Sequence, residues 1–227
     1  MNPAIDLAGV WKFYGDYAAL RDITLAVEEG SCCALLGRNG AGKTTLLRIL
    51  AGLSSFERGS AQLFGASPRQ AHAGFLGHGI GVYEDLSARE NLHFFARLAE
   101  VAQPESIAAE WLERVGLANA SDMLVRQFSR GMRQRLALAR TFLHTPKILL
   151  LDEPFTSLDD RAIAMLSELL VESRRRGATI ILSTHQLREA MVIASHVALI
   201  ENGRLRHAGE RTEAMLDDPG LLYRLHA

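Results

Sequence analysis

The stretch "GRNGAGKT", residues 37–44, decides the fold of this chain. It fits the pattern G-x-x-x-x-G-K-[ST] in full. An apolar run typical of a buried strand, "CCALL" at residues 32–36, stands before it, and a helical pattern follows it. Backbone N–H groups and the helix dipole at such a strand–loop–helix junction attract anions. The sequence therefore predicts a phosphate-binding loop. The two correct flanks disfavour the alternative, a glycine-rich turn that matches the pattern by chance.

The residue types within this loop suit phosphate chemistry. Gly37, Gly40 and Gly42 allow the backbone to turn so that its N–H groups point inward. Lys43 is long enough to reach the β- and γ-phosphates of a nucleotide, and Thr44 offers a hydroxyl to Mg²⁺. We therefore expect Thr44 to be one of the residues that hold the metal.

Two carboxylates follow a second apolar strand, "ILLLDE" at residues 148–153. Ligands of open parallel sheets bind beyond the carboxyl ends of the strands. Asp152 is therefore expected near Mg²⁺, through water, and Glu153 is the candidate general base that orients an attacking water. Both could instead be ordinary polar residues at a strand end, a reading that the full phosphate loop makes the weaker one.

Short apolar runs alternate with helical patterns along most of the chain, which predicts an α/β fold with a parallel sheet covered on both faces. We expect strands over residues 22–30, 31–37, 59–65, 147–153, 178–184 and 196–203. We expect helices over residues 41–53, 87–101, 105–116, 130–144, 159–176 and 186–194, and a helical C-terminal tail over 211–227.

The chain reads as a single domain, 1–227, with one inserted unit. Residues 87–144 lack strand patterns and are predicted to form a helical subdomain, whereas 1–86 and 145–227 form the α/β core. Ser87 followed by Glu90 is typical of a capping box at a helix start.

Composition sets further limits on function. The chain has 227 residues, of which 48% are hydrophobic and 22% charged, with a net charge of -1. This is ample for a packed core, and the near-neutral charge gives no reason to expect nucleic acid as a partner. Adjacent Cys32 and Cys33 point to opposite faces of a strand, so we expect buried free thiols. No apolar run approaches the ~20 residues that span a bilayer, so any membrane association is expected through a partner.

A polar stretch, "FSRGMRQR" at residues 128–135, precedes the helical pattern "LALARTFLH". Ser129 is a good N-cap candidate, and a helix start with free N–H groups attracts anions. No anion is provided nearby in the sequence. This stretch either only caps a helix or receives a phosphate held elsewhere.

Five motifs occur in an order that resembles the ATP-binding cassette (ABC) ATPases. They are "GRNGAGKTT", "FSRGMRQRLALAR", "ILLLDEP", "SLD" and "STH". The resemblance runs from Tyr14 to about Gly209. It implies a P-loop NTPase (RecA-like) core with an antiparallel β edge and an inserted α-helical subdomain. It also implies ATP as the substrate, Mg²⁺ as the cofactor and ATP hydrolysis as the activity. The ATP-binding residues it implies are Tyr14, Gly37, Arg38, Asn39, Gly40, Ala41, Gly42, Lys43, Thr44 and Thr45.

In such proteins two subunits pack head to tail, and each ATP lies between the phosphate loop of one and the signature helix of the other. The resemblance thus implies that Ser129 and Gly131 contact the γ-phosphate held by a second copy. Arg130 and Met132 depart from the family's usual glycine and glutamine. Arg130 either adds a charge-assisted phosphate contact or faces solvent or a partner surface, as most arginines do.

Three further residues take roles from the resemblance, each with a simpler alternative. Tyr14 resembles the aromatic residue that stacks on adenine, with Tyr17 as a rival, or it is a strand-edge residue. Asp159 resembles the residue at the dimer seam, or it caps the helix that starts at 160. His185 resembles the switch histidine at the γ-phosphate and is predicted to be catalytic together with Glu153.

The segment that links core and helical subdomain, "GFLGHGIGVYEDLSARENL", has His78 where most family members have glutamine. Because Mg²⁺ prefers oxygen ligands, we assign His78 to a coupling loop, with a contact of its imidazole to the metal through water as the alternative. "FLGH" and "LSARENL" resemble the cytochrome c maturation (heme exporter) ATPase subfamily.

We therefore expect an ATPase subunit of an export-type transporter, bound to integral membrane subunits at the cytoplasmic face of the cell membrane. The alternatives are an exporter of drugs or lipids, a non-transport ABC ATPase such as an iron–sulfur assembly factor, and a nucleic-acid-associated ABC module. The chain lacks the long coiled-coil insertion and the tandem second cassette of the nucleic-acid class.

Overall fold

A computed structural model describes residues 3–77 and 81–225 of the chain. Its centre is a six-stranded sheet in the order β5-β6-β7-β3-β8-β9. The first five of these strands are parallel, and β9 pairs antiparallel with β8 at one edge. The strands are β3 (Cys32–Leu36), β5 (Gly74–Leu76), β6 (Ile148–Asp152), β7 (Thr179–Ser183), β8 (His196–Glu201) and β9 (Arg204–Glu210).

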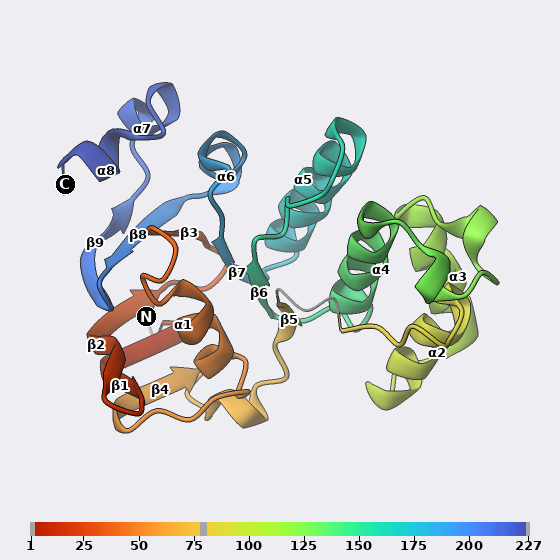
Figure 1. Ribbon diagram of the computed structural model, residues 1–227, viewed down its shortest axis with the longest axis horizontal. Helices are drawn as coiled ribbons and strands as arrows, with labels where there is room; N and C mark the ends of the chain where they lie inside the picture. The colour runs from red at the N-terminus through yellow and green to blue at the C-terminus, as the bar shows by residue number, and fades with distance from the viewer. Residues whose placement is uncertain (1–2, 78–80, 226–227) are drawn as a thin grey trace.

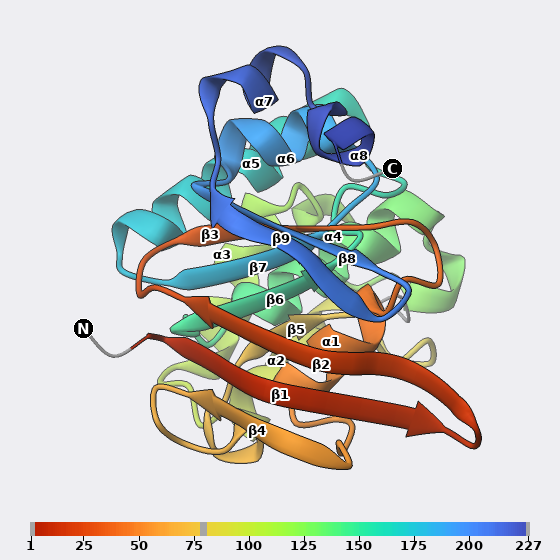
Figure 2. The ribbon, with the colours of Figure 1, turned by 90° about the vertical axis from the view of Figure 1, so that its left-hand side faces the viewer.

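A second, three-stranded antiparallel sheet packs in front of the first in Figure 2. It consists of β1 (Ile5–Tyr14), β2 (Tyr17–Val27) and β4 (Arg58–Leu63), with β1 in the middle. A tight turn joins β1 to β2, so that Tyr14 pairs with Tyr17 at the tip of the hairpin.

Helices lie on both sides of the central sheet and in a group at one end of the molecule (Figure 1). The α-helices are α1 (Lys43–Leu50), α2 (Ala88–Leu98), α3 (Pro104–Arg114), α4 (Arg130–Phe142), α5 (Asp160–Arg175), α6 (Leu187–Ile193), α7 (Glu213–Asp217) and α8 (Leu221–Leu225). The part of the chain that the structure describes also forms three short 3-10 helices: η1 (Pro68–Gln70), η2 (Ala118–Ala120) and η3 (Val125–Gln127). Among the described residues, no helix has the length and apolar character needed to cross a membrane.

The central sheet is buried on both faces, as the continuous apolar strands predict. All five residues of β3, β6 and β7 are buried. Successive side chains enter two different cores, since strand residues alternate between faces. Cys32 joins the core beneath α4, α5 and α6, and Cys33 joins the core shared with α1 and the antiparallel sheet. Both thiols are free, and burial raises the pKa of each to about 12, which confirms the expectation of buried thiols.

Most predicted elements are confirmed with ends shifted by a few residues. Pro104 stands in the first turn of α3, where its missing N–H costs nothing. Ser87 and Glu90 form a full capping box at the start of α2. Helix α1 is shorter than predicted because Gly52 adopts a φ of 70° and the chain turns there. The helical tail is confirmed as α7 and α8.

Three strands were not predicted, and each lacks a clear local signal. Strand β1 contains Gly9 at a φ of 59°, and its pairing shifts between Leu7 and Val10, so its alternation is interrupted. Strand β5 has three residues, and β9 alternates between exposed and half-buried positions with no apolar run.

Residues 87–144 contain α2, α3 and α4 and no strand, and Figure 1 shows these helices at the end of the molecule away from β9. Arg140 of α4 donates to the carbonyls of Phe75 and Gly81 at 2.9 and 2.7 Å, which ties this region to the core. The division into core and subdomain stays a prediction.

Candidate nucleotide-binding site

The loop over residues 37–44 connects the carboxyl end of β3 to α1 in a shape that requires glycine. Gly37 has a φ of +148°, and a Cβ there would lie 2.3 Å from the Ile200 carbonyl oxygen. Gly42 has a φ of +112°, and a Cβ there would lie 2.8 Å from the Ala19 carbonyl oxygen. Gly42 is also the N-cap of α1 and offers no side-chain acceptor. The first N–H groups of α1 are thus left to a ligand or to water, as at other anion-binding helix starts.

Lys43 lies folded back across this loop. Its buried ammonium donates to the carbonyls of Gly37 at 2.7 Å and Arg38 at 3.3 Å. Burial lowers the pKa of Lys43, and the nearby carboxylates of Glu153 and Asp152 act in the opposite direction. The ammonium is therefore a positive charge at the loop, and the hydrogen bonds it makes to the described residues go to carbonyl oxygens.

Asp152 ends β6 beside this loop, and only 3% of it is exposed. Its Oδ2 accepts from Thr44 Oγ1 at 2.7 Å, and its Oδ1 accepts from Ser183 Oγ at the end of β7. Three elements distant in sequence thus converge on one carboxylate. The described residues hold no cluster of three or more His, Cys, Asp or Glu side chains that could bind a metal by themselves. A hydroxyl plus one carboxylate nevertheless fits Mg²⁺, which binds proteins through one or two carboxylates and substrate phosphates.

Glu153, the next residue, adopts a φ of 54°, an unusual value for a residue with a side chain. Its N–H donates to the Ser183 carbonyl at 2.9 Å, which fixes this turn against β7. Its Oε2 accepts from the backbone N–H of His185 at 3.2 Å and lies 2.8 Å from His185 Nδ1. Left-handed backbone of this kind costs free energy and clusters at functional sites. The two predicted catalytic residues are thus in contact.

These residues face one cavity of about 650 Å³. It is lined by Tyr14, Tyr17, Ala19, Asn39, Gly40, Ala41, Gly42, Lys43, Thr44, Thr45, Arg130, Asp152, Glu153, Thr156 and His185. Tyr14 and Tyr17 stand at the hairpin tip, 53% and 57% exposed, so both rivals for the adenine contact reach the same opening. Gly37 and Arg38 belong to the loop but are not part of the cavity wall.

The three predicted residues of the stretch at 128–135 do not all lie in the wall of this cavity. Ser129 is the exposed N-cap of α4, and its Oγ accepts from the Met132 N–H at 3.2 Å. Arg130 lines the cavity of its own chain, whereas Ser129 and Gly131 do not. A Cβ at Gly131 would lie 3.1 Å from the Ser157 carbonyl oxygen, so the start of α4 packs closely on the turn after Glu153.

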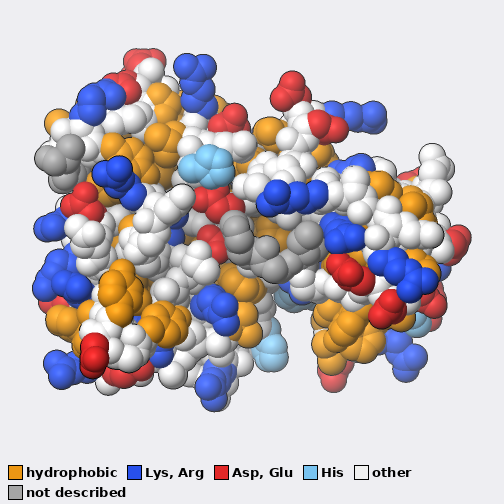
Figure 3. All heavy atoms as spheres, viewed as in Figure 1, with side chains coloured by type: hydrophobic (Ala, Val, Ile, Leu, Met, Phe, Trp, Pro, Cys, Tyr) orange, Lys and Arg blue, Asp and Glu red, His pale blue; other side chains and the backbone are white. Residues whose placement is uncertain are grey.

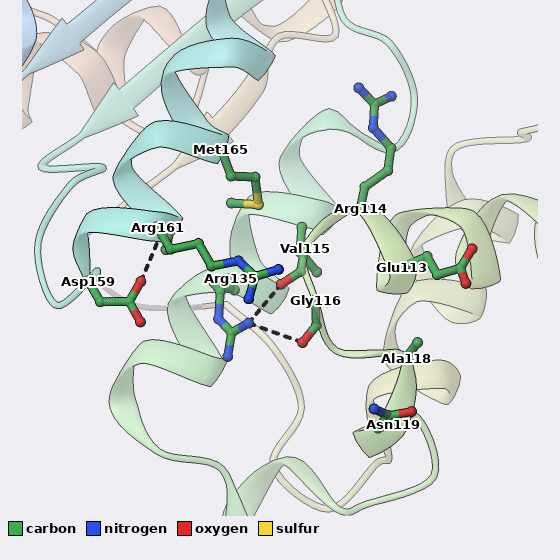
Figure 4. A pocket seen from close by; sticks show the side chains of 11 residues that line it. Glu113, Arg114, Val115, Gly116, Ala118, Asn119, Arg135, Asp159, Arg161 and Met165 are labelled. Atoms are coloured by element: carbon green, nitrogen blue, oxygen red, sulfur yellow. Dashed lines mark hydrogen bonds between the residues drawn. The ribbon is translucent and has the colours of Figure 1, made fainter.

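Asp159 caps α5, because its Oδ1 accepts from the Ala162 N–H at 2.8 Å. This confirms the simpler of its two interpretations, and its place at a dimer seam stays a prediction. Asp159 lines a second cavity of about 540 Å³ between α3, α4 and α5 (Figure 4). In that cavity Arg135 donates to the carbonyls of Val115 and Gly116. His78 lies outside the described residues.

Sequence reasoning missed four participants, and one of them, Ala19 of β2, lines the cavity. Ser183 binds Asp152, and its signal was a hydroxyl at the end of the strand "IILST". Thr156 lines the cavity four residues after Asp152. Tyr223 Oη accepts from the Gly37 N–H at 2.8 Å across 186 residues of sequence, and no local pattern announces that contact.

The fold and this site define a P-loop NTPase. The family described as "ABC transporter" matches residues 20–156, and the chain belongs to it. It is accordingly an ABC ATPase, and the resemblance of the five motifs to this family is confirmed.

Two relatives and one solved structure illustrate the similarity. The daunorubicin resistance ATP-binding protein DrrA3 of Streptomyces coeruleorubidus is 37% identical, with 96% of this chain and 72% of that protein covered. The Nod factor export ATP-binding protein I of Bradyrhizobium diazoefficiens is 35% identical, with 96% and 73% covered. A structure of the ATP binding subunit of an ABC transporter matches with a TM-score of 0.86 and 28% identity, over 98% of this chain and 94% of that one.

Proposed function

We propose that this protein is the ATP-hydrolysing subunit of an export-type ABC transporter and that it binds Mg-ATP in the 650 Å³ cavity. The contact between Thr44 and Asp152 carries the proposal. It joins the phosphate loop to the end of β6 and brings together a hydroxyl and a carboxylate, two oxygen ligands of the kind that Mg²⁺ binds.

ATP binding is proposed to change the partners of Lys43. The ammonium now held by the Gly37 and Arg38 carbonyls would turn to the β- and γ-phosphates, where charge-assisted hydrogen bonds are stronger. Tyr14, or its neighbour Tyr17, would stack on the adenine at the hairpin tip. The remaining contacts come from the loop residues Arg38, Asn39, Gly40, Ala41, Gly42, Thr44 and Thr45.

Thr44 and Asp152 are the residues that would hold Mg²⁺. The ion supplies charge neutralisation on the phosphate oxygens when it is bound. The two hydroxyls now bonded to Asp152 keep its carboxylate oriented toward the loop. The bond from Ser183 to Asp152 Oδ1 would keep that orientation when the Thr44 hydroxyl leaves Oδ2 to bind the ion.

Glu153 is proposed as the general base. It would accept a proton from water while the water oxygen bonds to the γ-phosphorus and the bond from that phosphorus to its bridging oxygen breaks, giving ADP and phosphate. His185, in contact with the same carboxylate, would position Glu153 and touch the γ-phosphate. The constrained turn at Glu153 keeps the carboxylate at the cavity wall.

A second copy of the chain is proposed to complete the site. Ser129 and Gly131 lie at the N-terminus of α4, outside the cavity of their own chain. Head-to-tail packing would bring that helix start against a γ-phosphate held by the partner, which answers the question of the missing anion. Asp159 would then lie at the seam, and Arg130 between the two subunits.

Integral membrane subunits are proposed as the other partners, which would place the protein at the cytoplasmic face of the membrane. A groove of about 520 Å³ between the core and α2 supports this, with the apolar residues Leu53, Phe75, Phe95 and Leu98 in its wall. Leu98 is 69% exposed, and Figure 3 shows hydrophobic side chains gathered over α2. We assign this groove to a cytoplasmic segment of a membrane subunit, with the coupling loop at His78 nearby in sequence.

Two cargo classes are proposed. The names of the two relatives, which concern daunorubicin and Nod factors, favour amphiphilic small molecules or lipids. The stretches "FLGH" and "LSARENL" favour heme export for cytochrome c biogenesis.

Co-purification from solubilised membranes tests the function. The full chain carrying an affinity tag is expected to retain integral membrane subunits, identified by mass spectrometry, and to hydrolyse ATP. Recovery of a soluble partner alone would support a non-transport ABC ATPase instead. The identity of the membrane subunits would separate heme export from the export of drugs or lipids.

A further inference from the structure

The C-terminal helix α8 reaches the phosphate loop. The Gly37 N–H, at the first position of the loop, donates to Tyr223 Oη at 2.8 Å. Figures 1 and 2 show α7 and α8 on the same side of the central sheet as α6, opposite to α1. The tail therefore contacts the phosphate loop from the face of the sheet opposite to α1, and the sequence motifs did not predict this contact.

Gly37 is held from both sides by side chains. Tyr223 Oη accepts a hydrogen bond from the Gly37 N–H, and the Lys43 ammonium donates one to the Gly37 carbonyl at 2.7 Å. The Ile200 carbonyl leaves no room for a Cβ, so the peptide is also confined by packing. Once Lys43 turns to the phosphates, the bond to Tyr223 remains as a side-chain restraint on the start of the loop.

The tail is docked rather than free at this point. Leu222 is buried to 1% exposure in the core beneath α6, and Tyr223 and Leu221 pack against the same core. Burial raises the pKa of the Tyr223 phenol, the Gly37 N–H opposes that shift, and the negative charge of Glu153 adds to it. The hydroxyl thus lies within the electrostatic reach of the proposed catalytic carboxylate.

We infer that Tyr223 is a positioning residue for the phosphate loop, through which docking of α8 and nucleotide binding strengthen each other. This inference uses one part of the proposed function, namely that the loop at residues 37–44 binds ATP. Coupling between two sites is reciprocal. A docked tail should therefore raise nucleotide affinity, and bound nucleotide should hold the tail in place by the same free energy.

Equilibrium titration of the full chain with ADP and with Mg-ATP tests the first half. Tyr223→Phe keeps the ring and removes the acceptor, and Leu225→Ala changes an exposed side chain of the same helix. Without this bond the loop is expected to populate other conformations, and ordering it again on binding costs up to about one net hydrogen bond. The Kd for both nucleotides should therefore be about 2- to 10-fold higher in Tyr223→Phe. Leu225→Ala should match the wild type. Equal affinities in the two variants, with a lower Tm for Tyr223→Phe, would make Tyr223 structural and overturn the inference.

Hydrogen exchange tests the second half in the wild type itself. Saturating ADP is expected to slow exchange of the amides in α8, and this protection is expected to shrink in Tyr223→Phe. Unchanged exchange in α8 while ADP protects residues 37–44 would refute the coupling and leave the proposed function intact. A wild type that binds no nucleotide would instead remove the proposed function, and this inference with it.

Discussion

Glu153 and His185 contact each other in the wall of the 650 Å³ cavity: Glu153 Oε2 lies 2.8 Å from His185 Nδ1. They follow neighbouring strands, β6 and β7, whose ends are held in register by the pairing of Asp152 with Ser183. A proton on Nδ1 lets His185 donate to the carboxylate, which holds Glu153 toward the cavity and leaves Nε2 for a ligand. The two residues are thus brought together by the pairing of β6 with β7, the strands that precede them.

Glu153→Gln is expected to abolish turnover and retain ATP. The amide keeps the size of the side chain and one oxygen acceptor for His185, but it cannot take a proton from water. General-base catalysis contributes about 10²- to 10⁴-fold, so kcat should fall by at least about 100-fold. Phosphate release measures kcat, and light scattering with Mg-ATP should show a stable dimer.

The matched control for this prediction is Glu168→Gln, an exposed carboxylate on α5. It should turn over ATP at the wild-type rate. Wild-type turnover in Glu153→Gln would remove Glu153 from the base role, and a strictly monomeric Glu153→Gln protein with saturating Mg-ATP would contradict the shared site.

Lys43→Ala is expected to weaken ATP binding far more than it weakens the fold. The ammonium is a charged donor of a loop residue that lines the cavity, and hydrogen bonds to charged groups contribute about 1.5–3 kcal/mol each. The Kd for Mg-ATP should therefore rise by about 10- to 100-fold in calorimetric titration. Arg48→Ala, an exposed change on the same helix, should leave Kd unaltered. Equal affinities for the two variants would show that Lys43 does not reach the phosphates.

Local sequence predicted the parts of this molecule whose structure is decided locally. Strand β6 and helix α5 were found because an apolar run and an amphipathic period each suffice to define them. The loop at 37–44 was found because its glycines, lysine and threonine match a phosphate-binding pattern between an apolar strand and a helical pattern. These are features that a window of about ten residues contains.

The parts that were missed depend on contacts between distant segments. Strand β1 is interrupted at Gly9 and owes its stability to β2 and β4 on either side. The bonds of Ser183 to Asp152 and of Tyr223 to Gly37 join residues 31 and 186 positions apart. Side chains of these types occur throughout the chain, and only the folded arrangement selects which of them lie at the site.

Gly37→Ala is expected to destabilise the protein and to disturb the loop. The new Cβ would lie 2.3 Å from the Ile200 carbonyl oxygen, at a φ that favours glycine. Overpacking of this kind costs about 1–3 kcal/mol, measured as a lower free energy of unfolding in urea. Nucleotide affinity should fall as well, because the peptide that Tyr223 and Lys43 hold must move.

Gly30→Ala is the control that separates the clash of a Cβ at Gly37 with the Ile200 carbonyl from the backbone strain that both variants share. Gly30 also has a positive φ, of +70°, but a Cβ there would meet nothing within 4 Å. Its cost should be limited to the strain of a left-handed backbone at a residue with a Cβ, about 1–2 kcal/mol, with nucleotide affinity unchanged. If the two variants are equally stable and bind ATP equally well, the close approach to Ile200 does not constrain the loop.

His144 is expected to make the protein less stable as the pH falls below 6.5. Burial lowers the pKa of His144 from its ordinary value of 6.5. A hydrogen bond to the His72 backbone opposes this shift, and the charges of His72 and Arg140 add to it. The unfolded chain therefore binds a proton on this residue at a higher pH than the folded chain does. Stability rises with pH wherever the unfolded state binds more protons, so this contribution is full above 6.5 and is lost as the pH falls toward the lower folded pKa.

Urea unfolding at pH 7.5 and at pH 5.5 measures the effect. His144→Gln removes the imidazole, so its loss of unfolding free energy between the two pH values should be smaller than that of the wild type. Lys147→Gln, an exposed change three residues on, carries no group that titrates in this range and should keep the full wild-type difference. Because carboxylates contribute equally to all three proteins, the comparison isolates one side chain. A His144→Gln protein with the wild-type pH dependence would mean that the imidazole at the end of α4 takes up its proton in the folded state as readily as in the unfolded one.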